Sequence, residues 1–394
     1  MNRRRFLHHG FFLPAAALAA RGSVAAFQSG PAARGKISLR EKFFGCIVGC
    51  HVGSSMGAPC EGWSYEQIEA KYGTIDRLMP YQHYNNGWNR EAGTTEDGCE
   101  RQKLMITAII EKKDRVNAED VRKIWVRDMK PEQAGMISEP FEMRLLEMAK
   151  SGIPACDIGR YCDYAGLNSF ARSCHPIGLI NAGDVEGAVT DVFEVGQLYQ
   201  TTNSRGLQWA AITGMAIAAA TKPEATVNSV LGAIHNGDPR FGKDFGEMRA
   251  AQEIERALTR TKDCKDFREL RKAFDAIYSG SGTPYAFSSA NEVVTKAICI
   301  FRMVKGNPKD AMIAAANLGR DTDCLAAIAA GISGALSGAS AIPEDWIRQV
   351  DYATTKMPVT NNRRPLREHA DGLYEAYRAR LRKMRSFADE MEQA

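Results

Sequence analysis

Two acidic clusters, far apart in the chain, carry the side chains best suited to chemistry. One is Thr94-Thr95-Glu96-Asp97 and the other is Asp321-Thr322-Asp323. Carboxylates with interleaved hydroxyls, and no Cys or His ligand pair beside them, form the oxygen-rich set that hard divalent cations such as Mg²⁺ prefer. We therefore predict a metal site if the fold brings the two clusters together.

The spacing of Asp321 and Asp323 restricts how they could share an ion. Residues two apart on a regular helix point to different sides, so both can face one ion only from a turn or a first helical turn. The apolar run at residues 325–330 places them at a helix N-terminus, where free N–H groups and the helix dipole favour carboxylates. The alternative is that one of them is only an N-cap, but the second acidic cluster favours the metal site.

The first 26 residues differ from the rest of the chain. Three arginines at positions 3–5 precede Phe6-Leu7, an apolar stretch runs from Phe11 to Ala20, and Ala-rich sequence continues to about Ala26. This pattern predicts a signal peptide at residues 1–26, too short to span a membrane as a mature helix. The paired arginines resemble the twin-arginine signal, which exports folded proteins, so we expect a periplasmic or extracellular protein.

Length and charge restrict the remaining possibilities. The 394 residues have 44% hydrophobic content, and we expect residues 36–394 to form a single globular domain. The formal charge of +4 falls to about zero (4 − 4) without the four arginines of residues 1–26. Neither nucleic acid nor an anionic membrane is therefore expected as a partner. The sequence leaves the oligomeric state open.

Nearly every periodic segment predicts a helix. Apolar residues recur at three- and four-residue intervals in residues 104–110, 121–126, 141–148, 209–220, 227–234, 293–304 and 311–316. Convincing alternating strands are absent, so we expect an all-α fold. The ten cysteines include no C-x-x-C pair and several lie in apolar helical sequence, which favours mostly reduced, buried thiols.

Glycines and aromatic residues give further expectations about packing. Glycine recurs every four residues at positions 45–57, and with similar spacing at positions 331–338, which indicates very close helix packing. A membrane dimerisation face is the rival interpretation, which His51 and the nearby serines and charges disfavour. In the basic C-terminal helix, we expect Tyr374, Tyr377, Leu381 and Met384 to form the buried side.

Several ordered motifs resemble the ADP-ribosylglycohydrolase family. Residues 49–61, which end in Gly57-Ala58-Pro59-Cys60-Glu61, are similar to its opening G-x-x-x-G-D-A-x-G-A-P-x-E motif. Thr95-Glu96-Asp97-Gly98 is similar to T-D-D-T, residues 317–324 to N-L-G-G-D-T-D-T, residues 176–179 to P-I-G-L, and residues 341–346 to the closing I-P-x-x-W. The resemblance runs from about Leu39 to Trp346, most of the mature chain.

The resemblance implies an orthogonal all-α helical bundle with Mg²⁺ or Mn²⁺, as one or two ions, in a central cleft. The residues that it implies as metal ligands are Thr95, Glu96, Asp97, Asp321 and Asp323. For proton transfer we assign Asp97 or Glu61. The expected substrate contacts are Trp63, Trp88, Asn89, Arg172, Ser173 and His175. The aromatic loop before the first acidic cluster, which holds Trp88 and Asn89, fits the wall of a substrate pocket or a cover for the core.

The chain also departs from the family pattern. Ser54 replaces an aspartate, Glu96 is one methylene longer than the family's aspartate, and Gly98 and Cys324 replace threonines. Because sulfur is poorly matched to Mg²⁺, Cys324 predicts that one metal is weak, replaced by a softer ion or missing. Bulky Leu167 and Phe170 stand in the loop where the family holds the phosphates of ADP-ribose, which argues against close phosphate approach.

We expect an exported, metal-dependent hydrolase that cleaves a glycosidic bond at an anomeric carbon. Release of ADP-ribose from a modified group is the nearest family activity. One alternative keeps the chemistry but acts on an extracytoplasmic sugar or nucleoside-like glycoside without ADP-ribose. The other is a non-catalytic sugar-binding family member, which the retained carboxylates argue against because unneutralised acidic groups repel one another.

Overall fold

The structure is a computed structural model, and it describes residues 37–82, 89–130, 140–162, 165–202, 204–237, 250–278, 288–360 and 362–393. The predicted signal peptide at residues 1–26 and the predicted substrate contact Trp88 lie outside the described residues. Residues 37–394 group as one compact unit.

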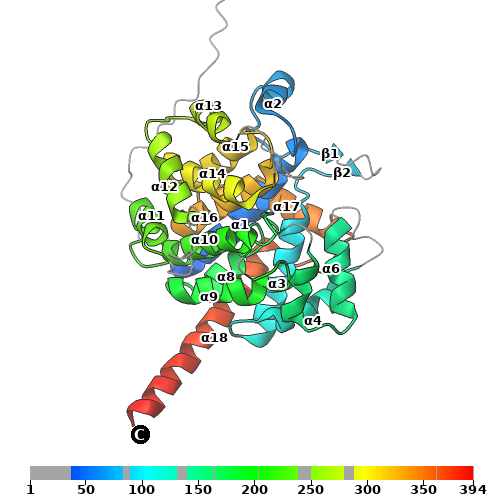
Figure 1. The fold of residues 1–394 in the computed structure, drawn as a ribbon, viewed down its shortest axis with the longest axis vertical. Helices are drawn as coiled ribbons and strands as arrows, with labels where there is room; N and C mark the ends of the chain where they lie inside the picture. The colour runs from blue at the N-terminus through cyan, green and yellow to red at the C-terminus, as the bar shows by residue number, and fades with distance from the viewer. Residues whose placement is uncertain are drawn as a thin grey trace, which may run out of the picture. The chain divides into compact units, whose positions relative to one another are not determined.

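Helices make up almost all of the described secondary structure, as the sequence predicted (Figure 1). The α-helices are α1 (Leu39–Gly57), α2 (Tyr65–Tyr72), α3 (Asp97–Lys112), α4 (Ala118–Asp128), α6 (Pro140–Lys150), α7 (Ala155–Ile158), α8 (His175–Ile180), α9 (Val185–Gly196), α10 (Arg205–Ala220), α11 (Val227–His235), α12 (Ala250–Arg260), α13 (Phe267–Tyr278), α14 (Ala290–Met303), α15 (Pro308–Ala316), α16 (Thr322–Ser337), α17 (Glu344–Lys356) and α18 (Leu366–Glu392). Short 3₁₀ helices lie at Ala58–Cys60 and Gly159–Tyr161.

Two apolar helices, α1 and α16, form the centre of the fold. A Cβ atom built on Gly49 would lie 2.2 Å from the carbonyl oxygen of Ala330, and one on Gly45 would lie 2.4 Å from that of Gly334. No side chain larger than hydrogen fits at such a contact, so the repeated glycines allow backbone to pack on backbone. At the far end, Gly57 meets the backbone of Thr322 in the same way, which joins the end of α1 to the start of α16.

The surrounding helices hold this pair in place. Helix α16 also packs against α10, α14 and α15, while α1 packs against α15 and α18. By length and composition alone, residues Leu39–Cys60 could cross a membrane, but 94% of the apolar window is buried inside the protein. Helix α1 is therefore a core helix here, which agrees with the interpretation of its glycines as packing contacts.

A hairpin of two strands, each two residues long, interrupts the helical pattern just before the first acidic cluster. Strands β1 (Tyr81–Gln82) and β2 (Asn89–Arg90) are antiparallel, with Tyr81 opposite Arg90. Strands this short show no alternating pattern, so they could not be predicted from the sequence. The hairpin places Tyr81 and Arg90 next to the start of α3.

The end of α18 corrects one prediction about the core. Tyr377 is buried as expected, but Leu381 is 40% exposed and Met384 is 53% exposed. In Figure 1, α18 extends away from the other helices towards the C-terminus. Helical spacing identified an apolar side of this helix correctly, but it could not show where the neighbouring helices end.

The cysteines match the expectation for a reduced protein. All ten thiols are free, and eight of them are buried, while Cys156 is exposed and Cys264 is partly exposed. Burial raises the pKa of several of these thiols, for example that of Cys299 to about 11. Such thiols behave as small apolar core residues.

Candidate functional site

The two acidic clusters meet at the N-terminal ends of two helices. Glu96 and Asp97 start α3, Asp321 and Asp323 start α16, and each of these four residues is at most 5% exposed. Glu61 follows the short 3₁₀ helix after α1 and lies close to both groups. Burial and then the negative charges of Asp323 and Asp321, followed by those of the α3 pair, raise the pKa of Glu61 well above its usual range.

The α16 carboxylates have oxygens without hydrogen-bond partners. The Asn168 side chain donates to Asp321 Oδ2 at 2.7 Å, but Asp321 Oδ1 and Asp323 Oδ1 are buried with no partner. Ligand atoms of Asp321, Asp323 and Cys324 lie within 4.8 Å of one another. Burial, followed by the charge of Asp321, raises the pKa of Asp323 well above its usual range.

This geometry decides between the two interpretations of the aspartates. Asp321 occupies the N-cap position of α16, but its side chain makes no capping hydrogen bond. A buried, unpartnered carboxylate oxygen costs free energy unless a cation or a proton compensates it. The observed arrangement therefore fits a cation site better than a helix cap.

Glu96 is held by the hairpin and by α1. The Tyr81 hydroxyl donates a short hydrogen bond to Glu96 Oε1, and Arg90 Nε lies 3.6 Å from the same oxygen. The Glu96 backbone N–H donates to Ser54 Oγ at 3.3 Å. Burial raises the pKa of Glu96 to about 7, although Arg90 and Tyr81 act in the opposite direction.

Asp97 is paired with a positive side chain. Arg172 Nη2 donates to Asp97 Oδ2 at 2.5 Å, and Arg172 Nη1 lies 3.5 Å from Cys324 Sγ. A Cβ atom on Gly98 would lie only 2.8 Å from Arg172 Cγ and Cδ. The absence of a side chain at Gly98 therefore makes the space through which Arg172 reaches between Asp97 and Cys324.

Thr95 is buried beside these carboxylates but takes part in a different network. Its hydroxyl donates to Glu100 Oε1 at 3.1 Å, and Glu100 also accepts from Lys103 and Thr360. A donating hydroxyl still has lone pairs for a cation. The predicted role of Thr95 as a ligand stays a prediction.

The structure separates the predicted substrate contacts into different environments. Trp63 is half-buried and stacks on Tyr72 with ring centroids 6.0 Å apart, and Asn89 is exposed on β2. Ser173 and His175 are fully buried: Ser173 donates to the carbonyl of Ser169, and His175 contacts Cys50 and the carbonyl of Ala327.

Three of the six assignments change as a result. Ser173 and His175 serve the packing of α8 against its neighbours and offer no surface to a substrate, so we withdraw both as substrate contacts. Arg172 is 7% exposed and faces carboxylates, so its position fits charge compensation within the site better than a contact to substrate phosphates.

Three residues that sequence reasoning did not assign complete the site: Tyr81, Arg90 and Asn168. Tyr81 and Asn168 stand in segments that the sequence had singled out, the aromatic loop and the loop before α8. Arg90 carried no signal, because its pairing depends on a hairpin too short to predict.

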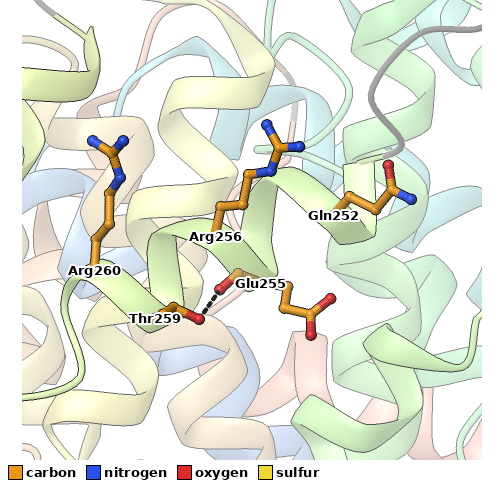
Figure 2. Close-up of a pocket in the computed structure, with 5 residues that line it drawn as sticks. All are labelled: Gln252, Glu255, Arg256, Thr259 and Arg260. Atoms are coloured by element: carbon orange, nitrogen blue, oxygen red, sulfur yellow. Dashed lines mark hydrogen bonds between the residues drawn. The ribbon is translucent and has the colours of Figure 1, made fainter.

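A surface hollow elsewhere in the described part of the protein is separate from this site. Figure 2 shows it on α12, lined by Gln252, Glu255, Arg256, Thr259 and Arg260, with a volume of about 620 Å³. All five side chains come from one helix, and the drawn hydrogen bond joins the Thr259 hydroxyl to the carbonyl of Glu255 within that helix. The hollow includes neither acidic cluster.

Comparisons with known proteins identify the family and agree with the all-α fold. The family model described as ADP-ribosylglycohydrolase matches residues 35–382. An uncharacterized protein of Escherichia coli K12, YegU, is 26% identical over 331 residues, which cover 79% of this chain and 94% of that protein. An uncharacterized protein of Archaeoglobus fulgidus is 25% identical over 314 residues, with 78% and 91% coverage. A solved structure named ADP-ribosylglycohydrolase-related protein complex shares the fold, with a TM-score of 0.60, 15% identity, and coverage of 86% of this chain and 98% of that one.

Proposed function

The chain belongs to the ADP-ribosylglycohydrolase family, and from this premise we propose that it hydrolyses a glycosidic bond with the help of one divalent cation held by Asp321 and Asp323. Family membership supports the glycohydrolase chemistry. The cation, its identity as Mg²⁺ or Mn²⁺, and the substrate are our proposal.

One observation carries the proposal. Asp321 Oδ1 and Asp323 Oδ1 are buried without hydrogen-bond partners, and a carboxylate oxygen of each residue lies within 4.8 Å of one of the other. Carboxylate oxygens in this arrangement repel one another, and a hard cation removes the repulsion while it satisfies both oxygens. Tests of the proposal should therefore begin with cation binding.

The Asp97 side of the site does not fit a second hard cation. Arg172 already supplies a positive charge to Asp97, and the neighbouring Cys324 offers sulfur, which Mg²⁺ disfavours. We therefore propose that the site takes a single ion and that Arg172 compensates the charge of Asp97.

The cation, Glu61 and Asp97 would have separate roles in the reaction. A bound cation would supply Lewis acidity for the sugar hydroxyls and for a water molecule. Burial, followed by the charges of Asp323 and Asp321, raises the pKa of Glu61, which suits this residue to donating a proton to the leaving group. Asp97 accepts a hydrogen bond from Arg172, and its carboxylate can stabilise positive charge that develops on the sugar ring.

The substrate is the least restricted part of the proposal. In the loop before α8, the N–H groups of Asn168, Arg172, Ser173 and Cys174 all donate to carbonyl groups within the protein. These N–H groups are not available to hold a diphosphate. This observation favours the second candidate, a glycoside without ADP-ribose, over release of ADP-ribose.

A substrate panel with matched variants tests the proposal. The panel contains ADP-ribosylated peptides, nucleosides and simple aryl glycosides, each assayed with and without Mg²⁺ or Mn²⁺. We expect cation-dependent turnover of one class and its loss in Asp323→Asn, whereas the exposed control Asp345→Asn keeps it. Turnover that needs no cation, or that survives in Asp323→Asn, would contradict the assignment.

We also propose export through the segment at residues 1–26. The paired arginines at positions 4 and 5 support this proposal, because twin-arginine transport depends on them. Cell fractionation should find the wild type outside the cytoplasm and the Arg4→Lys/Arg5→Lys variant inside it. Equal distributions of the two proteins would argue against this route.

A further inference from the structure

The last turns of α18 present an apolar stripe that the described part of this chain does not cover. Every residue from Leu381 to Gln393 is exposed. Met384, Phe387 and Met391 are 53%, 65% and 58% exposed, and together with Leu381 they follow the three- and four-residue spacing of one helix side. Figure 1 shows this end of α18 extending beyond the other helices. Three large apolar side chains side by side in water indicate a contact surface.

The charges beside the stripe change sign along the helix. Arg382, Lys383 and Arg385 come first, and Asp389, Glu390 and Glu392 follow, so the net charge of residues 381–393 is zero (3 − 3). Lys383 contacts Asp114 at 2.8 Å, and the freely exposed part begins after it. A positive half followed by a negative half is complementary to a copy of itself that runs in the opposite direction.

We propose that the end of α18 pairs with the same segment of a second copy of this chain, as an antiparallel helix pair. With the two-fold axis at Phe387, Arg385 of one copy lies level with Asp389 of the other. Arg382 similarly lies level with Glu392, and Met384 lies within one residue, 1.5 Å, of the level of Met391. The aromatic rings of the two Phe387 residues meet at the centre.

The charged residues lie on the correct side of the helix for this pairing. Arg382, Arg385, Asp389 and Glu392 are spaced by three, four and three residues, so they follow one edge of the apolar stripe. In a two-fold antiparallel pair, the same edge of each helix faces the other copy. A parallel pair would instead place like charges together, which is unfavourable.

The size of the contact predicts a reversible dimer. Each copy contributes about three helical turns, which is small beside the surface that stable dimers bury. We therefore expect a monomer–dimer equilibrium that shifts across protein concentrations of about 1 to 100 µM in sedimentation equilibrium. The inference is independent of the proposed hydrolase function.

Charge exchange tests both the pairing and its direction. In the full chain, Arg385→Asp and Asp389→Arg should each weaken dimerisation about tenfold or more, and the double variant should restore it. Phe387→Glu should abolish dimerisation, while Tyr352→Glu, at an exposed aromatic residue elsewhere, should leave it unchanged.

Three outcomes would overturn the proposal. The first is a wild-type protein that is monomeric at every concentration. The second is a double variant that fails to restore dimerisation. The third is a Phe387→Glu variant that dimerises as strongly as the wild type. Cosedimentation of a monomeric wild type with anionic phospholipid vesicles would assign the stripe to a membrane surface instead. Far-ultraviolet circular dichroism of each variant confirms that the fold is kept.

Discussion

Replacing Glu96 with glutamine should flatten the pH dependence of stability of the metal-free protein. Glu96 is buried at the start of α3, where burial raises its pKa to about 7 from an ordinary value of 4.5. Glutamine keeps the shape and can still accept the hydrogen bond from Tyr81, but it has no charge to titrate. The substitution therefore removes the titration of Glu96 and preserves the hydrogen bond from Tyr81.

The size of the effect follows from the two pKa values. A shift of one pKa unit corresponds to about 1.36 kcal/mol, so a difference of about 2.5 units corresponds to about 3 kcal/mol of unfolding free energy. Between the two pKa values the folded protein retains a proton on Glu96 that the unfolded chain has lost. The stability from this group is therefore complete below pH 4.5 and is lost as the pH rises through about 7.

Urea unfolding from pH 4.5 to pH 8 in the presence of a chelator measures this difference. The loss of unfolding free energy over that range should be smaller in Glu96→Gln than in the wild type by about 3 kcal/mol. The buried histidines also titrate: burial lowers the pKa of His51 to about 3 and that of His175 to about 4, which weakens the fold in acid. They are present in both proteins and cancel in the comparison.

A matched control variant and added cation test whether the change in pH dependence comes from Glu96. Glu344→Gln, at a highly exposed side chain on α17, should reproduce the wild-type profile. Saturating Mg²⁺ or Mn²⁺ should flatten the wild-type profile, because a cation favours the charged form of nearby carboxylates. Identical pH profiles for the metal-free wild type and Glu96→Gln would refute the argument that burial raises the pKa of Glu96 in the folded protein.

Further predictions concern the helix crossing and the number of ions. Gly49→Ala should lower the unfolding free energy by at least about 3 kcal/mol, since its Cβ would lie 2.2 Å from the carbonyl of Ala330. Gly232→Ala, where nothing lies within 4 Å, should raise it by about 0.5–1 kcal/mol in the same urea titration, and the reverse order would contradict the packing account. The double variant Gly98→Thr/Cys324→Thr should displace Arg172 and bind two Mn²⁺ ions per chain by calorimetry, where the wild type binds one. A single ion in both proteins would show that Arg172 does not exclude the second.

Much of the fold could be predicted because its signals are local. Apolar periodicity identified the helices, and the glycine spacing in α1 predicted the close contact that Gly49 makes with Ala330. The paired aspartates before an apolar run predicted a helix start, and α16 begins there. In each case a short stretch of sequence determines the structure.

The features that sequence analysis missed depend on contacts between distant segments. Nothing near Arg172 indicates that its side chain passes beside Gly98 to reach Asp97, because that path exists only once α3 and the loop before α8 are packed together. The burial of His175 and the exposure of Met384 have the same origin. Periodicity shows which side of a helix is apolar, but not where its neighbours lie.

A crystal structure of the protein soaked with Mn²⁺, with an anomalous difference map, tests the central claim most directly. We predict one peak, within about 2.0–2.3 Å of oxygens of Asp321 and Asp323, with Arg172 still bound to Asp97. The absence of a peak at these aspartates at millimolar Mn²⁺ would contradict the claim that the buried carboxylates form a cation site. Two peaks would keep the site but contradict the role of Arg172.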